Sequence, residues 1–170
     1  ISAGFREVGP EGVALEAKVR QEQAKFDGMR ILGPNCLGII VPGIHLNASF
    51  AAATPAVGHV GFISQSGALC TSVLDWAIDE AIGFSYFVSV GNMLDVTMSD
   101  LMDYFGSATE TQSIILYIES IREAREFMSA ARAFARTKPI VAYQAGRFAE
   151  SAQAAASHTG AMAALDAVYE

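Results

Sequence analysis

Short apolar runs alternate along the chain with longer segments in which apolar residues recur at helical spacing. Runs rich in Val, Ile, Phe and Tyr predict strands, with errors of ~2 to 4 residues at their ends. The predicted strands are residues 29–32, 60–64, 84–90, 113–119 and 139–145. Because such alternation is typical of βαβ units, the sequence predicts an α/β fold around a parallel sheet.

Helices are predicted in most of the gaps between these strands. Leu69, Val73, Ala77 and Ala81 share one helical face, and Gly83 then supplies a stop. The other predicted helices are residues 11–26, one from about Thr97, residues 122–136 and one after Gly160.

The stretch 41–58 contains two prolines and no Asp, Glu, Lys or Arg, which favours a connector. We therefore expect residues 1–42 to end one α/β domain, residues 43–56 to connect, and residues 57–170 to form a second, nearly complete domain.

Composition and charge restrict the function. The chain of 170 residues is 52% apolar and 17% charged, as expected of a folded protein with a large core. Its net charge of -7 argues against general nucleic-acid binding, so anionic ligands must be held by local dipoles. No apolar run approaches the roughly 20 residues that cross a bilayer, and no secretion signal opens the chain, so we expect no membrane contact. The two cysteines, Cys36 and Cys70, lack metal-ligand spacing and give only a weak signal of a disulfide, which favours a reducing cytoplasm.

The residues that leave each strand are the first candidates for chemistry, since ligands of open parallel sheets bind beyond the carboxyl ends of the strands. Ser64, Gln65, Ser66 and Gly67 connect a strand directly to a helix. Such a junction leaves free N–H groups at a positive dipole end, which together form a phosphate site. A serine in this position also serves as a helix N-cap, and the two uses can coexist.

Two further strand exits carry an acidic and a basic group. The strand 113–119 delivers Glu119 to the ligand edge, where a carboxylate either orients an imidazole or caps the following helix. His158 stands between small residues, and Gly160 allows its loop an unusual backbone conformation. This setting leaves His158 sterically free, as a nucleophile requires.

The remaining candidates have simpler interpretations. In the segment 33–38, Asn35 and Cys36 lie between two glycines, and this motif alone favours a tight interdomain turn. Cys70 is expected in the core, and no His, Cys or Asp spacing indicates a metal site. The arginines of the helix 122–136 alternate with glutamates, which favours a solvated surface with local ion pairs. These arginines are Arg122, Arg125, Arg132 and Arg136; the remaining histidines, His45 and His59, are taken as structural.

Taken in order and spacing, the segments 33–38 and 64–68, the strand that ends at Glu119 and the segment 157–161 resemble the α portion of succinyl-CoA synthetase. They are still more similar to the ADP-forming acetate–CoA ligases, a branch that the segments 1–9 and 89–92 with Asp95 also match. The resemblance covers essentially the whole chain. It implies a flavodoxin-like, doubly wound parallel sheet, preceded by the C-terminal βαβ remnant of a Rossmann-like CoA-binding domain.

The resemblance also implies a reaction and roles for residues. Acyl-CoA and phosphate yield acyl phosphate and CoA, the acyl phosphate phosphorylates a histidine, and the phosphohistidine passes its phosphoryl group to ADP. His158 corresponds to the nucleophile and Glu119 to its orienting carboxylate. The turn of Ser64, Gln65, Ser66 and Gly67 corresponds to the phosphate cradle, and Asn35 and Cys36 lie near the thiol end of CoA.

The resemblance finally implies partners outside this chain. The first residues lack a methionine and have the character of a strand end, so we expect an excised fragment of a homo- or hetero-oligomer. CoA is a substrate, an N-terminal domain completes its site, and an ATP-grasp domain or β subunit binds ATP or ADP with magnesium. Two alternatives stay open: a CoA-sensing region fused to a GNAT-type protein lysine acetyltransferase, and a non-catalytic flavodoxin-like binding module.

Overall fold

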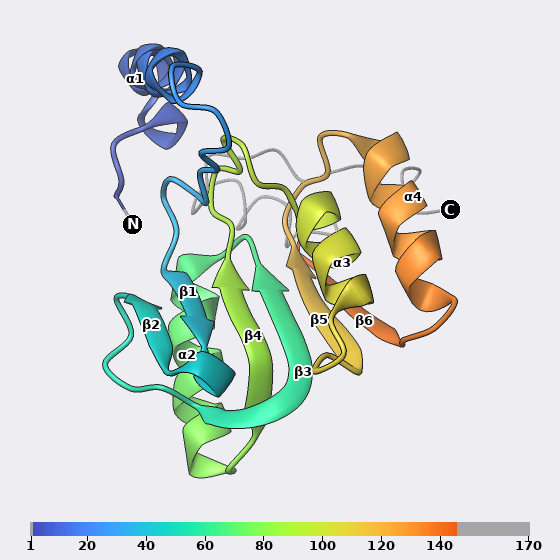
Figure 1. Cartoon of the computed structure of the whole chain (residues 1–170). Coiled ribbons are helices and arrows are strands. Elements are labelled where there is room, and N and C mark those ends of the chain that lie inside the picture. Colours follow the sequence, from blue (N-terminus) through green and yellow to red (C-terminus); the bar gives the residue numbers. More distant parts are fainter. Residues whose placement is uncertain (1, 146–170) are drawn as a thin grey trace.

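The computed structural model describes residues 2–145, and within this part six strands form one mixed sheet (Figure 1). Their order across the sheet is β2-β1-β4-β3-β5-β6. The last four strands are mutually parallel, whereas β1 pairs antiparallel with both β2 and β4. The strands are β1 (Gly38–Val41), β2 (Leu46–Ser49), β3 (Ala56–Ser64), β4 (Gly83–Ser89), β5 (Ser113–Ile118) and β6 (Ile140–Gln144).

The parallel part of the sheet has the flavodoxin-like winding. Counted from β3 as the first, these strands stand in the spatial order 2-1-3-4. The chain leaves β3 toward β4 and then returns to the other side of β3 to form β5. The carboxyl ends of β3 and β5 therefore meet where the winding reverses, with Ser64 beside Tyr117. Ligands of such sheets bind beyond this edge.

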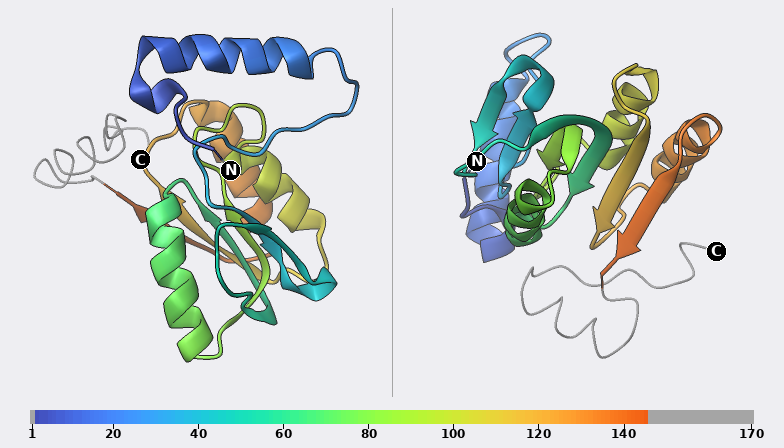
Figure 2. Two further views of the ribbon diagram at one scale, coloured as in Figure 1. Left: turned by 90° about the vertical axis from the view of Figure 1, so that its left-hand side faces the viewer. Right: turned by 90° about the horizontal axis from the view of Figure 1, so that it is seen from below.

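The helices cover both faces of the sheet and its carboxyl edge. Helix α2 packs on one face, α3 and α4 pack on the other, and α1 lies beyond the carboxyl ends of the parallel strands (Figures 1 and 2). No helix of the described part is long and apolar enough to span a membrane. The helices are α1 (Pro10–Gln23), α2 (Gly67–Asp79), α3 (Met98–Ser107) and α4 (Ala124–Ala135), with short 3-10 turns η1 (Arg6–Val8) and η2 (Pro42–Ile44).

Strand alternation divides the core into two layers. Phe62 and Ile63 are neighbours in β3, and their side chains point to opposite faces of the sheet. Phe62 stacks on Phe87 with ring centroids 4.6 Å apart and packs in the layer under α2. Ile63 packs with Met102 of α3 in the layer under α3 and α4. Both layers are tightly filled, so the sheet is a rigid platform for the loops at its carboxyl edge.

Most predicted elements are confirmed, and two stretches differ. The strands expected at 60–64, 84–90, 113–119 and 139–145 correspond to β3, β4, β5 and β6. Residues 29–32 form no strand, and the backbone of Ile31 bonds to the loop after β4 instead of joining the sheet. The expected connector 43–56 contains β2, and β1 already pairs with β4, so the sheet begins at Gly38. The helix predicted after Gly160 lies outside the described residues.

Candidate functional site

The turn between β3 and α2 is closed by its two serines. Ser66 is the N-cap of α2, and its Oγ accepts the N–H of Leu69 at 3.3 Å. The Oγ of Ser64 accepts the N–H of Ser66 at 3.1 Å and donates to the carbonyl oxygen of Ser66 at 3.0 Å. Both hydroxyls are thus engaged within the turn, and Ser66 performs the capping role that the sequence left open.

The same turn leaves two backbone donors unused. Within the described part of the chain, no acceptor takes the N–H of Gly67 or of Ala68. Gly67 is half-buried and Ala68 is exposed, so a ligand can approach both. The first N–H groups of a helix carry the positive end of its macrodipole and attract phosphate oxygens. The candidate phosphate cradle therefore consists of these peptide groups rather than of the serine hydroxyls.

Gln65 ties this turn to the loop that follows β5. Its Oε1 accepts the N–H groups of Glu119 and Ser120, the latter at 2.9 Å, and its Nε2 donates to the carbonyl oxygen of Ser120 at 2.9 Å. Its own N–H donates to the carbonyl oxygen of Tyr117 at 3.2 Å. Gln65 is buried, and its side chain is committed to the backbone beside Glu119. Its membership of the predicted phosphate-binding turn stays a prediction.

Glu119 is the carboxylate that this arrangement holds at the edge of the sheet. It directly follows β5, is half-buried, and accepts no hydrogen bond on its side chain from the described residues. Burial raises the pKa of this carboxyl group, and no partner in the described part of the chain offsets the effect. A group that donates an N–H or carries a positive charge would stabilise its ionised form. The structure therefore leaves Glu119 available for an imidazole.

The turn that carries Asn35 and Cys36 lies against the same edge. The N–H of Leu37 donates to the Oγ of Ser89 at 3.0 Å, and a Cβ added to Gly67 would lie 3.6 Å from the nitrogen of Leu37. Asn35 is exposed, whereas Cys36 is 8% exposed and burial raises the pKa of its thiol. Of the two residues expected near CoA, Asn35 can therefore touch a ligand and Cys36 packs as a small apolar group.

Three of the four predicted strand exits thus come together. The first turn of α2 contacts the Asn35 turn on one side and is tied to Glu119 through Gln65 on the other. A cavity of about 250 Å³ lies next to the loop after β5, lined in part by Ser120 and by Arg20 of α1. His158 lies outside the described residues, so its place at this site stays a prediction.

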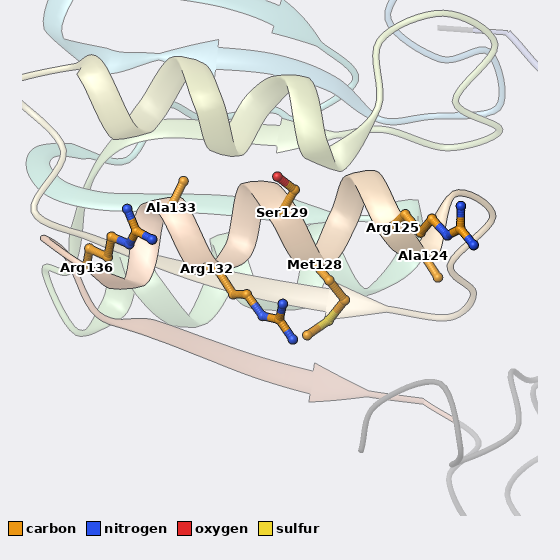
Figure 3. Close-up of a pocket in the computed structure, with 7 residues that line it drawn as sticks. All are labelled: Ala124, Arg125, Met128, Ser129, Arg132, Ala133 and Arg136. Carbon is orange, nitrogen blue, oxygen red and sulfur yellow. The ribbon is translucent and has the colours of Figure 1, made fainter.

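A second hollow, of about 600 Å³, runs along the outer face of α4 (Figure 3). Arg125, Arg132 and Arg136 line it together with small residues and Met128. The local ion pairs expected for these arginines are not formed with any described residue. None of the described residues that line this hollow comes from the strand exits, so it is separate from the candidate site.

Sequence reasoning missed the polar contacts under α1. Glu16 is 4% exposed and forms an ion pair with Arg6, and Asn92, in the loop after β4, is also buried. Asp95 accepts hydrogen bonds from Arg30 and Gln23. Asn92 and Asp95 entered the sequence argument through their match to a family motif, whereas a glutamate inside an ordinary helical segment gives no signal of burial.

Comparison with known proteins agrees with the architecture. The family described as "Succinyl-CoA ligase like flavodoxin domain" matches residues 57–170. The chain is 45% identical over its whole length to the α subunit of acetate–CoA ligase [ADP-forming] II of Pyrococcus furiosus, of which it covers 37%. It is 46% identical to acetate–CoA ligase [ADP-forming] of Methanocaldococcus jannaschii, of which it covers 24%.

A solved structure gives the same result. The dinucleotide forming acetyl-coenzyme A synthetase 1 of Candidatus Korarchaeum cryptofilum, in complex with phosphate and ADP, superposes with a TM-score of 0.90 at 40% identity. The match covers 99% of this chain and 36% of that one. The chain therefore spans between about a quarter and a little more than a third of the length of these relatives. It belongs to the succinyl-CoA ligase-like flavodoxin domain family.

Proposed function

We propose that the intact protein is an ADP-forming acetate–CoA ligase and that this chain carries its phosphoryl relay. Phosphate displaces CoA from acyl-CoA to give acyl phosphate and free CoA. A nitrogen of His158 then attacks the phosphorus, the bond to the acyl oxygen breaks, and the carboxylic acid leaves. ADP finally takes the phosphoryl group from His158, which regenerates the imidazole and yields ATP.

One structural observation carries this proposal. Two N–H groups at the start of α2 and the carboxylate of Glu119, none of which has a partner among residues 2–145, share one sheet edge, and Gln65 links them. Preorganised N–H groups hold phosphate without a strongly basic protein, which suits a chain with a net charge of -7. The carboxylate supplies the partner that an imidazole needs. An ordinary helix N-terminus would account for the N–H groups, but not for the carboxylate beside them.

Glu119 is assigned as the orienting carboxylate of His158. A neutral imidazole is nucleophilic through its unprotonated nitrogen, and an acceptor for the opposite N–H selects that tautomer. Phosphorylation makes the ring cationic, so a nearby carboxylate stabilises the intermediate. Because burial raises the pKa of Glu119, the favourable charge pair also offsets the cost of an ionised carboxylate at this position.

The complete reaction requires parts beyond this chain. A Rossmann-like CoA-binding domain would precede residue 1, and an ATP-grasp domain, in the same polypeptide or in a β subunit, would bind ATP or ADP with magnesium. The relatives support this division, since the chain spans 37% of the Pyrococcus α subunit and 24% of the Methanocaldococcus ligase. His158 would then move between the acyl-phosphate site and the nucleotide site.

Radiolabelled ATP tests the relay in the intact protein. With magnesium present, we expect a phosphoprotein that is stable to base and labile to acid, as a phosphohistidine is. The label should be absent from His158→Ala, and should form more slowly in Glu119→Gln with the same final stoichiometry. CoA and acetate should discharge it. An unlabelled wild-type protein, or a label that persists in His158→Ala, would overturn the proposal.

A further inference from the structure

The loop after β4 packs closely against the turn that carries Asn35. The N–H groups of Asn92 and Leu94 donate to the carbonyl oxygens of Pro34 and Gly33, each at 2.8 Å. Gly91 has φ +50, and a Cβ at this position would lie 2.2 Å from the carbonyl oxygens of Pro34 and Asn35. The close approach of the two backbones therefore requires glycine at position 91.

The side-chain amide of Asn92 uses both its nitrogen and its oxygen in hydrogen bonds at this contact. Its Nδ2 donates to Glu7 at 2.7 Å and to Glu16 at 2.9 Å, and its Oδ1 accepts from the Nδ2 of Asn35 at 3.3 Å. Asn92 is 8% exposed, whereas Asn35 is exposed. One buried amide thus connects η1 and α1, which hold the two glutamates, with the exposed side chain of Asn35.

The glutamates provide a fixed anchor for that amide. Burial raises the pKa of Glu16, but hydrogen bonds from Arg6 and Asn92 and the charge of Arg6 outweigh it and lower the pKa overall. The Nε of Arg6 donates to Glu16 at 2.6 Å. Glu16 is therefore ionised at neutral pH and accepts charge-assisted hydrogen bonds, which are the stronger kind. With both of its hydrogens held, the orientation of the Asn92 amide is determined.

We propose that Asn92 is a positioning residue that fixes the side chain of Asn35 for the thiol end of CoA. The inference rests on the proposed function, because CoA is the ligand that the family resemblance implies for Asn35. The phosphoryl relay leaves Gly91 and Asn92 without a role, and the positioning of Asn35 supplies one. The CoA step would then depend on the packing of η1 and α1 against Asn92. The transfer between ATP and His158 would not depend on this packing.

The experiment compares Asn92→Leu with Arg30→Ala in the intact enzyme. Arg30 ties a neighbouring segment to Asp95 of the same loop and does not contact Asn35, so it is the matched control. For Asn92→Leu we expect the KM for CoA to rise about fivefold, as loss of one hydrogen bond of ordinary strength gives. ATP-dependent phosphorylation of His158 should stay within twofold of wild type. Arg30→Ala should change neither quantity.

A double-mutant cycle with Asn35→Ala separates positioning from general damage. If Asn92 acts through Asn35, the double variant has the same KM for CoA as Asn35→Ala alone. Additive effects, or an unchanged KM in a folded Asn92→Leu enzyme, overturn the inference. Glu7→Gln, expected to raise the KM two- to threefold, provides a milder variant if Asn92→Leu does not fold. Loss of labelling in the wild type would instead refute the proposed function itself.

Discussion

Replacement of Gln65 by Met tests whether the two halves of the candidate site are mechanically linked. Met has nearly the size of Gln and lacks its hydrogen-bonding groups. The substitution removes the acceptor for the N–H groups of Glu119 and Ser120 and the donor to the carbonyl oxygen of Ser120. The core beneath β3 is unchanged, so any effect comes from the loop after β5.

The structure sets the size of the effect. Three backbone groups lose their partner, and each lost bond costs about 1 kcal/mol, the low end for unsatisfied groups because Glu119 and Ser120 are half-buried and water can reach them. We therefore expect the free energy of unfolding to fall by about 3 kcal/mol. A displacement of the Glu119 carboxylate by about 1 Å would slow phosphorylation of His158 by a factor of about 100.

Chemical denaturation and rapid-quench labelling with ATP measure the two quantities. The matched control is Gln144→Met, at the end of β6 beside Ile118, because the Nε2 of Gln144 is buried and finds no partner among the described residues. This control should stay within about 0.5 kcal/mol of wild type. If both variants lose the same stability, or if Gln65→Met labels within threefold of wild type, Gln65 does not position Glu119.

Two other predictions concern charge and backbone fit. Burial raises the pKa of Glu119 in the folded state, so folding favours its protonated form. In a His158→Ala background, the free energy of unfolding should therefore fall as pH rises through the folded pKa. Glu119→Gln should therefore raise the thermal midpoint at pH 7 and not at pH 4, and a difference that is equal at both values contradicts this. Gly91→Ala should lower the free energy of unfolding, measured in urea, by about 3 kcal/mol. The new Cβ would overlap two carbonyl oxygens, and the left-handed φ of this position disfavours alanine. Gly43→Ala, with no atom within 4 Å of the new Cβ, is its control, and equal losses would refute the fit.

The strands could be predicted where local pattern and tertiary role agree. The residues of β5, Ser113–Ile118, form a short β-branched and aromatic run between polar residues. Residues 29–32 are also mostly apolar, but the backbone of Ile31 bonds to the loop after β4 and not to a strand. Only long-range contacts decide between these two outcomes. The hairpin of β1 and β2 escaped prediction because its strands have four residues each and flank Pro42.

The site was predictable to the extent that parallel strands bring their carboxyl ends to one edge. This rule alone places the turn after β3 beside Glu119. It does not tell which groups a side chain uses, and Gln65 is the clear instance, since its partners are 54 and 55 positions away. The buried state of Glu16 likewise depends on Asn92, 76 positions away. Such contacts join residues that are far apart in the sequence, so local sequence patterns cannot predict them.

The proposed relay places two negative groups at one sheet edge, a phosphate on the N–H groups of Gly67 and Ala68 and the carboxylate of Glu119. These groups repel each other, and burial of Glu119 strengthens the repulsion because fewer water molecules screen it. An imidazole between them removes the conflict, since it donates an N–H to the carboxylate and presents its other nitrogen to phosphorus. A serine would add no positive charge on phosphorylation, and a lysine would be protonated and unreactive at neutral pH. The proposed relay therefore favours histidine over serine or lysine as the residue that carries the phosphoryl group.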